Sequence, residues 1–385
     1  MTPENALNAK SKRIHAIDIL RGLVILLMLV DHTRERFFLH EQVTDPMQID
    51  ATSTSLFFTR LTAHFCAPIF VFLTGLSAWL YAHPRQKPQR SASGFLFKRG
   101  LFLILLEVTL INFSWFGSYQ ALYLQVMWAI GLSMIALALL VKMPRYFIGV
   151  LGLLIVFGHN ALTPISFTPE EWMYPIWTIL HDRGYLIQDA LIPVKISYPL
   201  LPWIGVIAVG YFAGPVYDAA LQVQQRYKWL LSVGVSSLIL LLILRGFNIY
   251  GETLPWEQQQ TVLETVSSFL NFTKYPPSLD FILLTLGVGA LLLYVFERFE
   301  HRWMLVLKTF GSVPMFFYIV HLYVLLLIYA VGVQFFGTNK GDYLGVDHVW
   351  MVWAIAAVLA LLLYWPTKWF SAYKKASSAT WIKYF

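Results

Sequence analysis

The chain has 385 residues, of which 58% are apolar and only 13% carry a charge. Soluble globular proteins have roughly 45–50% apolar and 25% charged residues, so the composition excludes a water-soluble fold, an intrinsically disordered chain and a collagen-like repeat. Most of the chain is therefore expected to lie in lipid. The single cysteine, Cys66, cannot form an internal disulfide, so folding needs no oxidising compartment.

The formal net charge is +7 and the mean hydropathy is +0.61. In a membrane protein, basic residues collect in the cytoplasmic loops. This tendency explains the positive balance without a nucleic-acid partner. No basic patch interleaved with aromatic residues is left once the loop charges are accounted for.

Ten segments are long and apolar enough to cross a bilayer, which takes about 20 residues per helix. They are residues 14–32, 65–82, 98–116, 120–141, 145–162, 200–217, 229–247, 279–297, 313–336 and 348–367. The sequence therefore predicts an all-α, polytopic integral membrane helix bundle of about ten transmembrane helices, forming one domain over residues 1–385. The first segment carries Asp18 and Arg21 and lacks a small-residue cleavage site, so we expect a retained helix and not a signal peptide.

The basic residues predict the orientation of the bundle. Nineteen of the 28 Lys and Arg residues fall on one side, eight fall on the other, and Arg21 lies within a span. The richer side is expected to be cytoplasmic, which makes both termini cytoplasmic. The longer loops on the other side, 33–64, 163–199 and 248–278, are rich in aromatic residues, proline and acids. Such loops can bind sugars or form ordinary interfacial belts, and residues 253–270 have the spacing of a short interfacial helix.

Ionisable residues at bilayer depth are costly and usually mark a site or a pathway. In the first segment Asp18, Arg21 and His32 share one helix face, in a stripe about 21 Å long that must face the bundle interior or a wet cavity. Asp18 and Arg21 can also simply neutralise each other. His32 lies beside Asp31 at the outer mouth of the stripe. A neutral imidazole near a carboxylate is the usual arrangement of a general base.

Polar residues also occur in other apolar segments and in the first outer loop. They are His40, His64, Glu107, Tyr318 and His321. A lone buried His or Tyr is more often a hydrogen-bond partner between helices than a catalytic group. Together these residues supply more imidazoles than packing needs, so we expect His64, Glu107 and His321 to line a cavity. The chain has no His-x-x-x-His or Cys-x-x-Cys spacing, so the sequence predicts no metal site.

Several motifs resemble those of a family of membrane acyltransferases. They are Asp18-Ile-Leu-Arg21-Gly22, Ala67-Pro68-Ile-Phe-Val-Phe-Leu-Thr-Gly75, Tyr198-Pro-Leu-Leu-Pro202-Trp203, Lys274-Tyr-Pro-Pro-Ser278 and Val313-Pro-Met-Phe-Phe-Tyr318-Ile-Val-His321. Through these motifs, residues 13–336 resemble the heparan-α-glucosaminide N-acetyltransferase family. The resemblance is closest to its bacterial branch, because the additional lumenal domain of the animal enzyme is missing.

The resemblance implies that an acetyl or acyl group moves from cytoplasmic acetyl-CoA to an amine or hydroxyl of an extracytoplasmic sugar. It places Asp18 at the family's first-span aspartate and His321 at its late-span histidine. His32 falls where the animal enzyme has an asparagine, and the animal enzyme's catalytic histidine lies further into the first outer loop, nearest to His40. The broader membrane acyltransferases of the O-antigen and peptidoglycan type often have a histidine at the end of a similar Arg-Gly helix, and His32 fits that pattern. His32 is therefore our first candidate for the general base and His40 the second, while Asp18 and Arg21 orient the stripe or contact CoA.

The resemblance also implies the partners of the site. Arg90, Lys98 and Arg99 can hold the phosphates of acyl-CoA, although each can also serve membrane topology alone. Lys274 and Tyr318 are expected in the substrate cavity together with Asp31. The expected partners are acyl-CoA, an extracytoplasmic glycan or amino sugar and the lipid bilayer of a bacterial inner membrane. A homodimer is a possible assembly, and no metal cofactor is expected.

Two other functions are compatible with the same residues. In a proton-coupled transporter, the intramembrane Asp, Glu and His residues would form a proton relay. In a catalytically inactive binding or scaffold protein, the polar stripe would have no chemical role. Stabilisation of the protein by CoA would separate an enzyme from a transporter.

Overall fold

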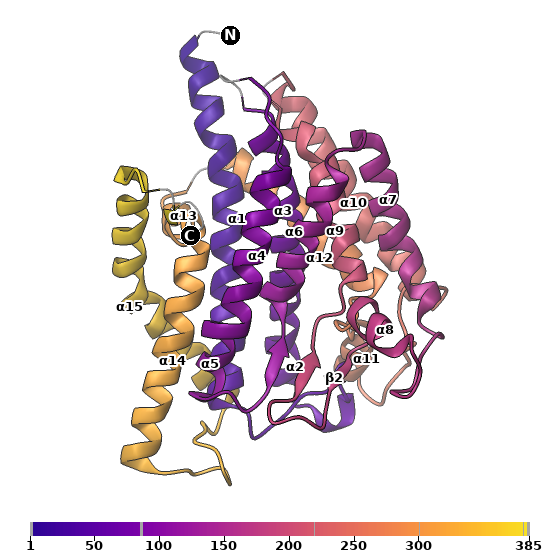
Figure 1. The fold of residues 1–385 in the computed structure, drawn as a ribbon, viewed down its shortest axis with the longest axis vertical. Coiled ribbons are helices and arrows are strands. Elements are labelled where there is room, and N and C mark those ends of the chain that lie inside the picture. The colour runs from indigo at the N-terminus through magenta and orange to yellow at the C-terminus, as the bar shows by residue number, and fades with distance from the viewer. Residues whose placement is uncertain (1–2, 85–87, 219, 300, 380, 383–385) are drawn as a thin grey trace.

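The computed structural model describes residues 3–84, 88–218, 220–299, 301–379 and 381–382, with side chains from His15 onward. Long helices run side by side along the long axis of the molecule (Figure 1). The α-helices are α1 (Pro3–Phe37), α2 (Thr54–Thr62), α3 (Cys66–Ala82), α4 (Ser93–Leu106), α5 (Asn112–Phe116), α6 (Val126–Leu140), α7 (Arg145–Gly158), α8 (Tyr174–Leu180), α9 (Leu201–Phe212), α10 (Val223–Gly246), α11 (Val262–Phe269), α12 (Leu279–Arg298), α13 (Met304–Ser312), α14 (Pro314–Phe336) and α15 (Val349–Ala376).

Short helical turns and three strands complete the fold. The 3₁₀ turns are η1 (Ile49–Ala51), η2 (Ala63–Phe65), η4 (His159–Leu162) and η5 (Gly214–Tyr217). The turn η3 (Glu107–Ile111) is a π-helical turn that joins α4 to α5. The strands are β1 (Leu122–Leu124), β2 (Gly184–Ile187) and β3 (Val194–Ile196).

Each of the ten predicted segments overlaps a helix, and the protein is a multi-pass membrane protein. Within the described part of the chain, six helical stretches are long and apolar enough to cross a membrane. They are Thr54–Ala82, Arg145–Leu162, Val223–Gly246, Leu279–Arg298, Pro314–Phe336 and Val349–Ala376. Two shorter apolar helices, Val126–Leu140 and Leu201–Phe212, correspond to two further predicted segments. The count of ten and the orientation of the termini remain predictions.

The two ends of the bundle differ in character. At one end, which we call the amino end, α1 begins (Figure 1). At the opposite end, which we call the loop end, lie α2, α8, α11 and the strand β2 (Figure 1). The three strands form a sheet in the order β1-β3-β2, in which β1 is parallel and β2 antiparallel to β3. This small sheet departs from the all-α prediction. Strand β1 lies at the start of the predicted segment 120–141, and β2 and β3 lie in the outer loop 163–199.

The outer loop 248–278 contains the short helix that its apolar spacing indicates, but over a narrower range. Helix α11 covers Val262–Phe269. It begins with a capping box, in which the Thr261 hydroxyl accepts a hydrogen bond from the Glu264 backbone N–H and the Glu264 carboxylate accepts one from the Thr261 N–H. The residues before Thr261 do not continue this helix because the cap ends it there.

Helix α1 lies among other helices, against α3, α12, α13, α14 and α15. Its contact with α13 depends on two glycines. A Cβ atom on Gly22 would lie 1.8 Å from the carbonyl oxygen of Leu307, and one on Gly311 would lie 1.8 Å from the carbonyl oxygen of Asp18. The two backbones therefore touch directly, as small residues allow in membrane helix packing.

Replacement of Gly22 by alanine is expected to destabilise the protein, because the added methyl group would force α1 away from α13. Overpacking of this kind typically costs roughly 1–3 kcal/mol. Gly94→Ala in α4 is the matched control, since a Cβ there meets no atom within 4 Å. Thermal unfolding in detergent should show a lower midpoint for Gly22→Ala and an unchanged or higher one for Gly94→Ala. Equal midpoints for the two variants would contradict this packing.

Candidate active site

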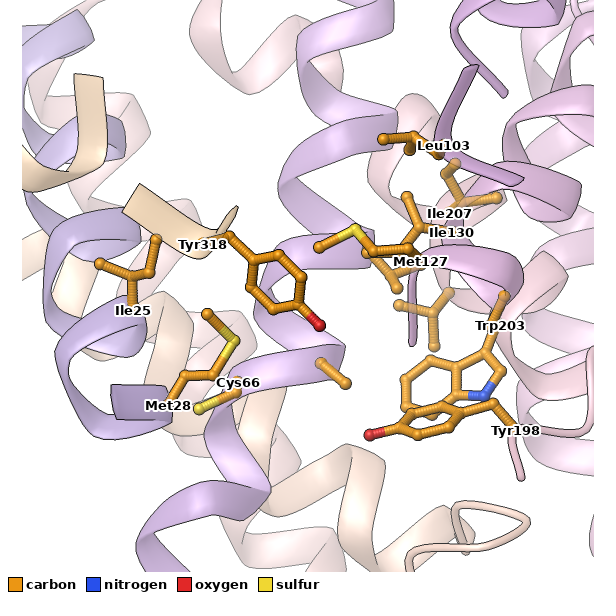
Figure 2. Packing of buried hydrophobic residues seen from close by; sticks show 14 of the residues in the cluster. Ile25, Met28, Cys66, Leu103, Met127, Ile130, Tyr198, Trp203, Ile207 and Tyr318 are labelled. Atoms are coloured by element: carbon orange, nitrogen blue, oxygen red, sulfur yellow. The ribbon is translucent and has the colours of Figure 1, made fainter. Parts of the chain in front are cut away.

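A cavity of about 360 Å³ lies within the bundle, lined by residues of α1, α3, α4, α6, α13, α14 and α15. Arg21, Arg99 and Lys374 are among its lining residues, and so are Asp31, His32, Tyr198 and Lys274. The wall between these polar groups is apolar and includes Ile25, Met28, Leu103, Met127 and Ile130. In Figure 2 the hydroxyl groups of Tyr318 and Tyr198 point toward the same central space, with Met28 and Cys66 below one side and Met127 and Ile130 above the other.

One face of α1 forms a wall of this cavity. Arg21, Ile25, Met28 and His32 line it at helical spacing, and Arg21 and His32 are separated by about 16 Å along the helix axis. Asp18 is not among the lining residues. Its carboxylate accepts a hydrogen bond from Arg21 at 3.2 Å and so helps to position that guanidinium. Arg21 also donates to the hydroxyl of Ser77 on α3 at 2.5 Å.

His32 is hydrogen-bonded to a second histidine. Its Nδ1 lies 2.8 Å from Nε2 of His321, and Nδ1 of His321 lies 2.7 Å from the carbonyl oxygen of Phe317. A carbonyl can only accept, so His321 carries its proton on Nδ1. In the neutral His321 ring Nε2 is then an acceptor, and His32 must donate from Nδ1. This network assigns the free lone pair of His32 to Nε2, which has no hydrogen-bond partner among the described residues.

Aromatic rings hold the His32 imidazole in place. The edges of Trp115 and Tyr318 pack against it, with ring centroids 5.3 Å and 5.7 Å away, and the ring of His321 stacks on it at 5.1 Å. The His32 residue is 8% exposed. Its orientation is therefore fixed by packing as well as by the hydrogen bond.

Asp31 does not orient His32, in contrast to the arrangement expected from the sequence. Its carboxylate pairs with Arg34 at 3.0 Å and with Arg60 at 3.1 Å, and all three side chains are almost fully buried. The charges of the two arginines draw the carboxylate away from the imidazole. Removal of one partner from a buried ion pair of this kind typically costs about 3–5 kcal/mol, so Asp31 has a structural reason to be present.

Three further predicted site residues lie away from the cavity lining, as does His321, which contacts the cavity residue His32 from outside the lining. His40 packs on Phe38, with ring centroids 4.7 Å apart. His64 is buried against Phe281, at 5.1 Å. Glu107 accepts hydrogen bonds from the backbone N–H groups of Met127 and Trp128 at 2.8 Å and 3.1 Å. It therefore caps the first turn of α6, where unpaired N–H groups attract a carboxylate. The expectation that His64, Glu107 and His321 line the cavity is corrected, because none of the three is among its lining residues.

The candidate CoA-binding cations separate into two groups. Arg99 lines the cavity. Lys98 and Arg90 are exposed, and the guanidinium of Arg90 stacks over the Tyr81 ring, with its Cζ 3.7 Å from the ring centroid. Lys374 also lines the cavity and donates to the carbonyl oxygen of Ser312 at 3.4 Å. Sequence reasoning counted Lys374 only as a loop charge, and nothing in its local pattern distinguishes it from its neighbour Lys375.

The loop-end side of the cavity contains a pair of tyrosines. The Tyr275 hydroxyl donates to the Tyr198 hydroxyl at 3.1 Å, and Tyr198 lines the cavity. Burial raises the pKa of Tyr198 well above its usual value, with a further contribution from Tyr275, so the phenol stays protonated at neutral pH. Tyr198 belongs to one of the motifs that resemble the family, but the sequence does not predict it as a site residue. In the described part of the chain, no group of three or more His, Cys, Asp and Glu side chains is placed to hold a metal ion.

The family model described as heparan-alpha-glucosaminide N-acetyltransferase, catalytic, matches residues 13–246, which is more than half of the chain. The chain belongs to this family. Membership implies an acetyltransferase in the membrane. The matched residues extend from within α1 to the end of α10, and they include Asp18, Arg21, His32 and Arg99. Lys274, Tyr318 and His321 lie beyond the matched residues. None of the curated proteins compared with the chain matches it.

Proposed function

We propose that the protein transfers an acetyl or acyl group from cytoplasmic acyl-CoA to an amine or hydroxyl of an extracytoplasmic sugar or glycan. One observation carries the proposal: a single cavity joins three cations, Arg21, Arg99 and Lys374, to His32, which is hydrogen-bonded to His321. Family membership supports the acetyl transfer. The amino end belongs to the side of the predicted topology that is richer in Lys and Arg, which supports an amino end that faces the cytoplasm.

The donor would enter at the amino end. Arg21, Arg99 and Lys374 offer three positive charges for the phosphates of CoA, and the arginine forks suit bidentate phosphate contacts. The thioester arm would then follow the apolar wall between Ile25 and Ile130. Arg21 and His32 are about 16 Å apart along α1, so an arm that spans this distance from the bound phosphates would place the reactive thioester at the imidazole.

The acceptor would enter from the loop end and lose its proton to Nε2 of His32. The nitrogen or oxygen of the acceptor would form a bond to the thioester carbonyl carbon, and the C–S bond would break when the tetrahedral intermediate collapses. The His32 imidazolium would return the proton to the CoA thiolate, which leaves as the free thiol. His321 would act as a positioning residue, because its hydrogen bond keeps the His32 lone pair on Nε2.

The membrane and the branch of the family that we propose for this protein follow from the family resemblance. We place the protein in a bacterial inner membrane and in the bacterial branch of the family, with no metal in the reaction. A homodimer is compatible with the proposal.

Replacement of His32 by glutamine is expected to lower acyl transfer by about 10²–10⁴-fold, because the acceptor would lose its general base. Release of free CoA thiol from acetyl-CoA, with glucosamine as the acceptor, measures the reaction in detergent-purified protein. His321→Gln should retain more activity than His32→Gln, because it disturbs the orientation of the base but leaves the base itself. His40→Ala, away from the cavity, is the control and should keep the wild-type rate. Full activity in His32→Gln, or loss confined to His40→Ala, would refute the assignment.

Addition of CoA is expected to raise the thermal unfolding midpoint of the wild-type protein, because a ligand that binds only the folded state stabilises it. The double variant Arg99→Ala, Lys374→Ala should lose most of this rise, since it removes two of the three proposed phosphate contacts. Lys98→Ala is the matched control, because Lys98 lies beside Arg99 but is exposed. A proton-coupled transporter would show no response to CoA in any variant, and that outcome would sink the enzyme proposal.

A further inference from the structure

Lys274 is a buried lysine that forms no direct ion pair with any described residue. The residue is 3% exposed, and its ammonium group makes no hydrogen bond or ion pair with any described residue. Its Nζ lies 5.3 Å from the centroid of the Tyr275 ring, and its charge also interacts, beyond hydrogen-bond distance, with the carboxylates of Asp31 and Asp45. Burial of an unpaired ammonium group is costly, so a lysine at such a position needs a compensating role.

The carboxylates around Lys274 are occupied by other partners. Asp31 pairs with Arg34 and Arg60. Asp45 accepts hydrogen bonds from the backbone N–H groups of Lys274 and Tyr275, at 3.1 Å and 2.8 Å. Both carboxylates interact with the Lys274 charge at a distance, but neither forms a hydrogen bond or ion pair with its ammonium group. The loop is therefore anchored through its backbone, and the charged end of the side chain is left without a direct hydrogen-bond partner among the described residues.

The position of Lys274 relates this charge to the reaction. Lys274 lines the same cavity as His32, but it comes from the loop before α12 and His32 comes from α1. Nucleophilic attack on a thioester places a negative charge on the carbonyl oxygen, and a preorganised donor at that oxygen lowers the barrier. The base supplied by His32 does not provide this donor.

We propose that Lys274 is a catalytic residue that donates a hydrogen bond to the thioester carbonyl oxygen and stabilises the oxyanion of the tetrahedral intermediate. This inference rests on the proposed acyl transfer. As the acceptor attacks the carbonyl carbon, the carbonyl π electrons move to the oxygen and are held by the Lys274 ammonium. When the C–S bond breaks, the electrons return to re-form the carbonyl, and Lys274 keeps its proton throughout.

Tyr318 is the rival donor. Its hydroxyl is buried, has no hydrogen-bond partner among the described residues, and belongs to a side chain that lines the cavity. A neutral phenol stabilises an oxyanion less than an ammonium does, because hydrogen bonds from charged groups are roughly twice as strong as neutral ones. The choice between the two groups can be tested by removing each one separately.

The test compares Lys274→Met, Lys274→Arg and Tyr318→Phe with the control Lys195→Met, which removes a lysine of β3 that does not line the cavity. Acetyl-CoA and glucosamine are the substrates, and release of CoA thiol is the readout. Lys274→Met should lower kcat about 10²–10³-fold, which is the usual effect of removing an oxyanion donor, and should leave stabilisation by CoA intact. Lys274→Arg should recover part of kcat because it restores a cationic donor, and Lys195→Met should match the wild type.

An acyl donor with a more electrophilic carbonyl provides a second test, because a purely structural role of Lys274 would not change the ratio of the rates with the two acyl donors. Fluoroacetyl-CoA needs less stabilisation of its oxyanion, so its rate advantage over acetyl-CoA should be larger in Lys274→Met than in the wild type or in His32→Gln. An increase in the KM for glucosamine with kcat unchanged would overturn the proposal and indicate that Lys274 binds the acceptor. Loss of kcat in Tyr318→Phe but not in Lys274→Met would overturn it in favour of Tyr318. Full activity in both Lys274→Met and His32→Gln would instead refute acyl transfer at this site.

Discussion

Charged side chains at membrane depth must be separated from the lipid, and this constraint organises the whole molecule. Helix α1 carries Arg21, Asp31 and His32 along an otherwise apolar stretch, so it is stable only where other helices cover that face. The structure meets this requirement with five neighbouring helices and with glycines that let α13 approach α1 closely. The polar face that cannot contact lipid then becomes the wall of an internal cavity.

The same constraint explains why the site combines paired and unpaired charges. Asp31 is matched by Arg34 and Arg60, and Asp18 is matched by Arg21, so these groups are stabilised in the absence of substrate. Nε2 of His32 and the ammonium group of Lys274 make no direct hydrogen bond or ion pair with any described residue. Groups that are buried, oriented and unpaired are those that can interact with a substrate without first breaking an internal contact. In this account, catalysis uses the polar groups that the fold leaves unsatisfied.

Sequence reasoning reached the helices and the stripe on α1, because both depend on local periodicity. Each predicted segment overlaps a helix, and the spacing that places Arg21 and His32 on one face holds in the structure. It could not identify the partner of His32, because His321 is 289 residues away and the pairing depends on the packing of α14 against α1. It also misplaced Glu107, whose role as a cap depends on the position of α6, and it missed Lys374, which reaches the cavity only through the packing of α15. The small sheet was missed because its strands are three or four residues long.

The most direct test of the central claim is an experimental structure of the protein with a non-reactive thioether analogue of acetyl-CoA. If the cavity carries the donor from one side of the membrane toward the other, the phosphates will lie against Arg21, Arg99 and Lys374 and the sulfur will lie beside His32. A ligand bound outside the bundle, or a sulfur atom separated from His32 by the apolar wall, would contradict the account.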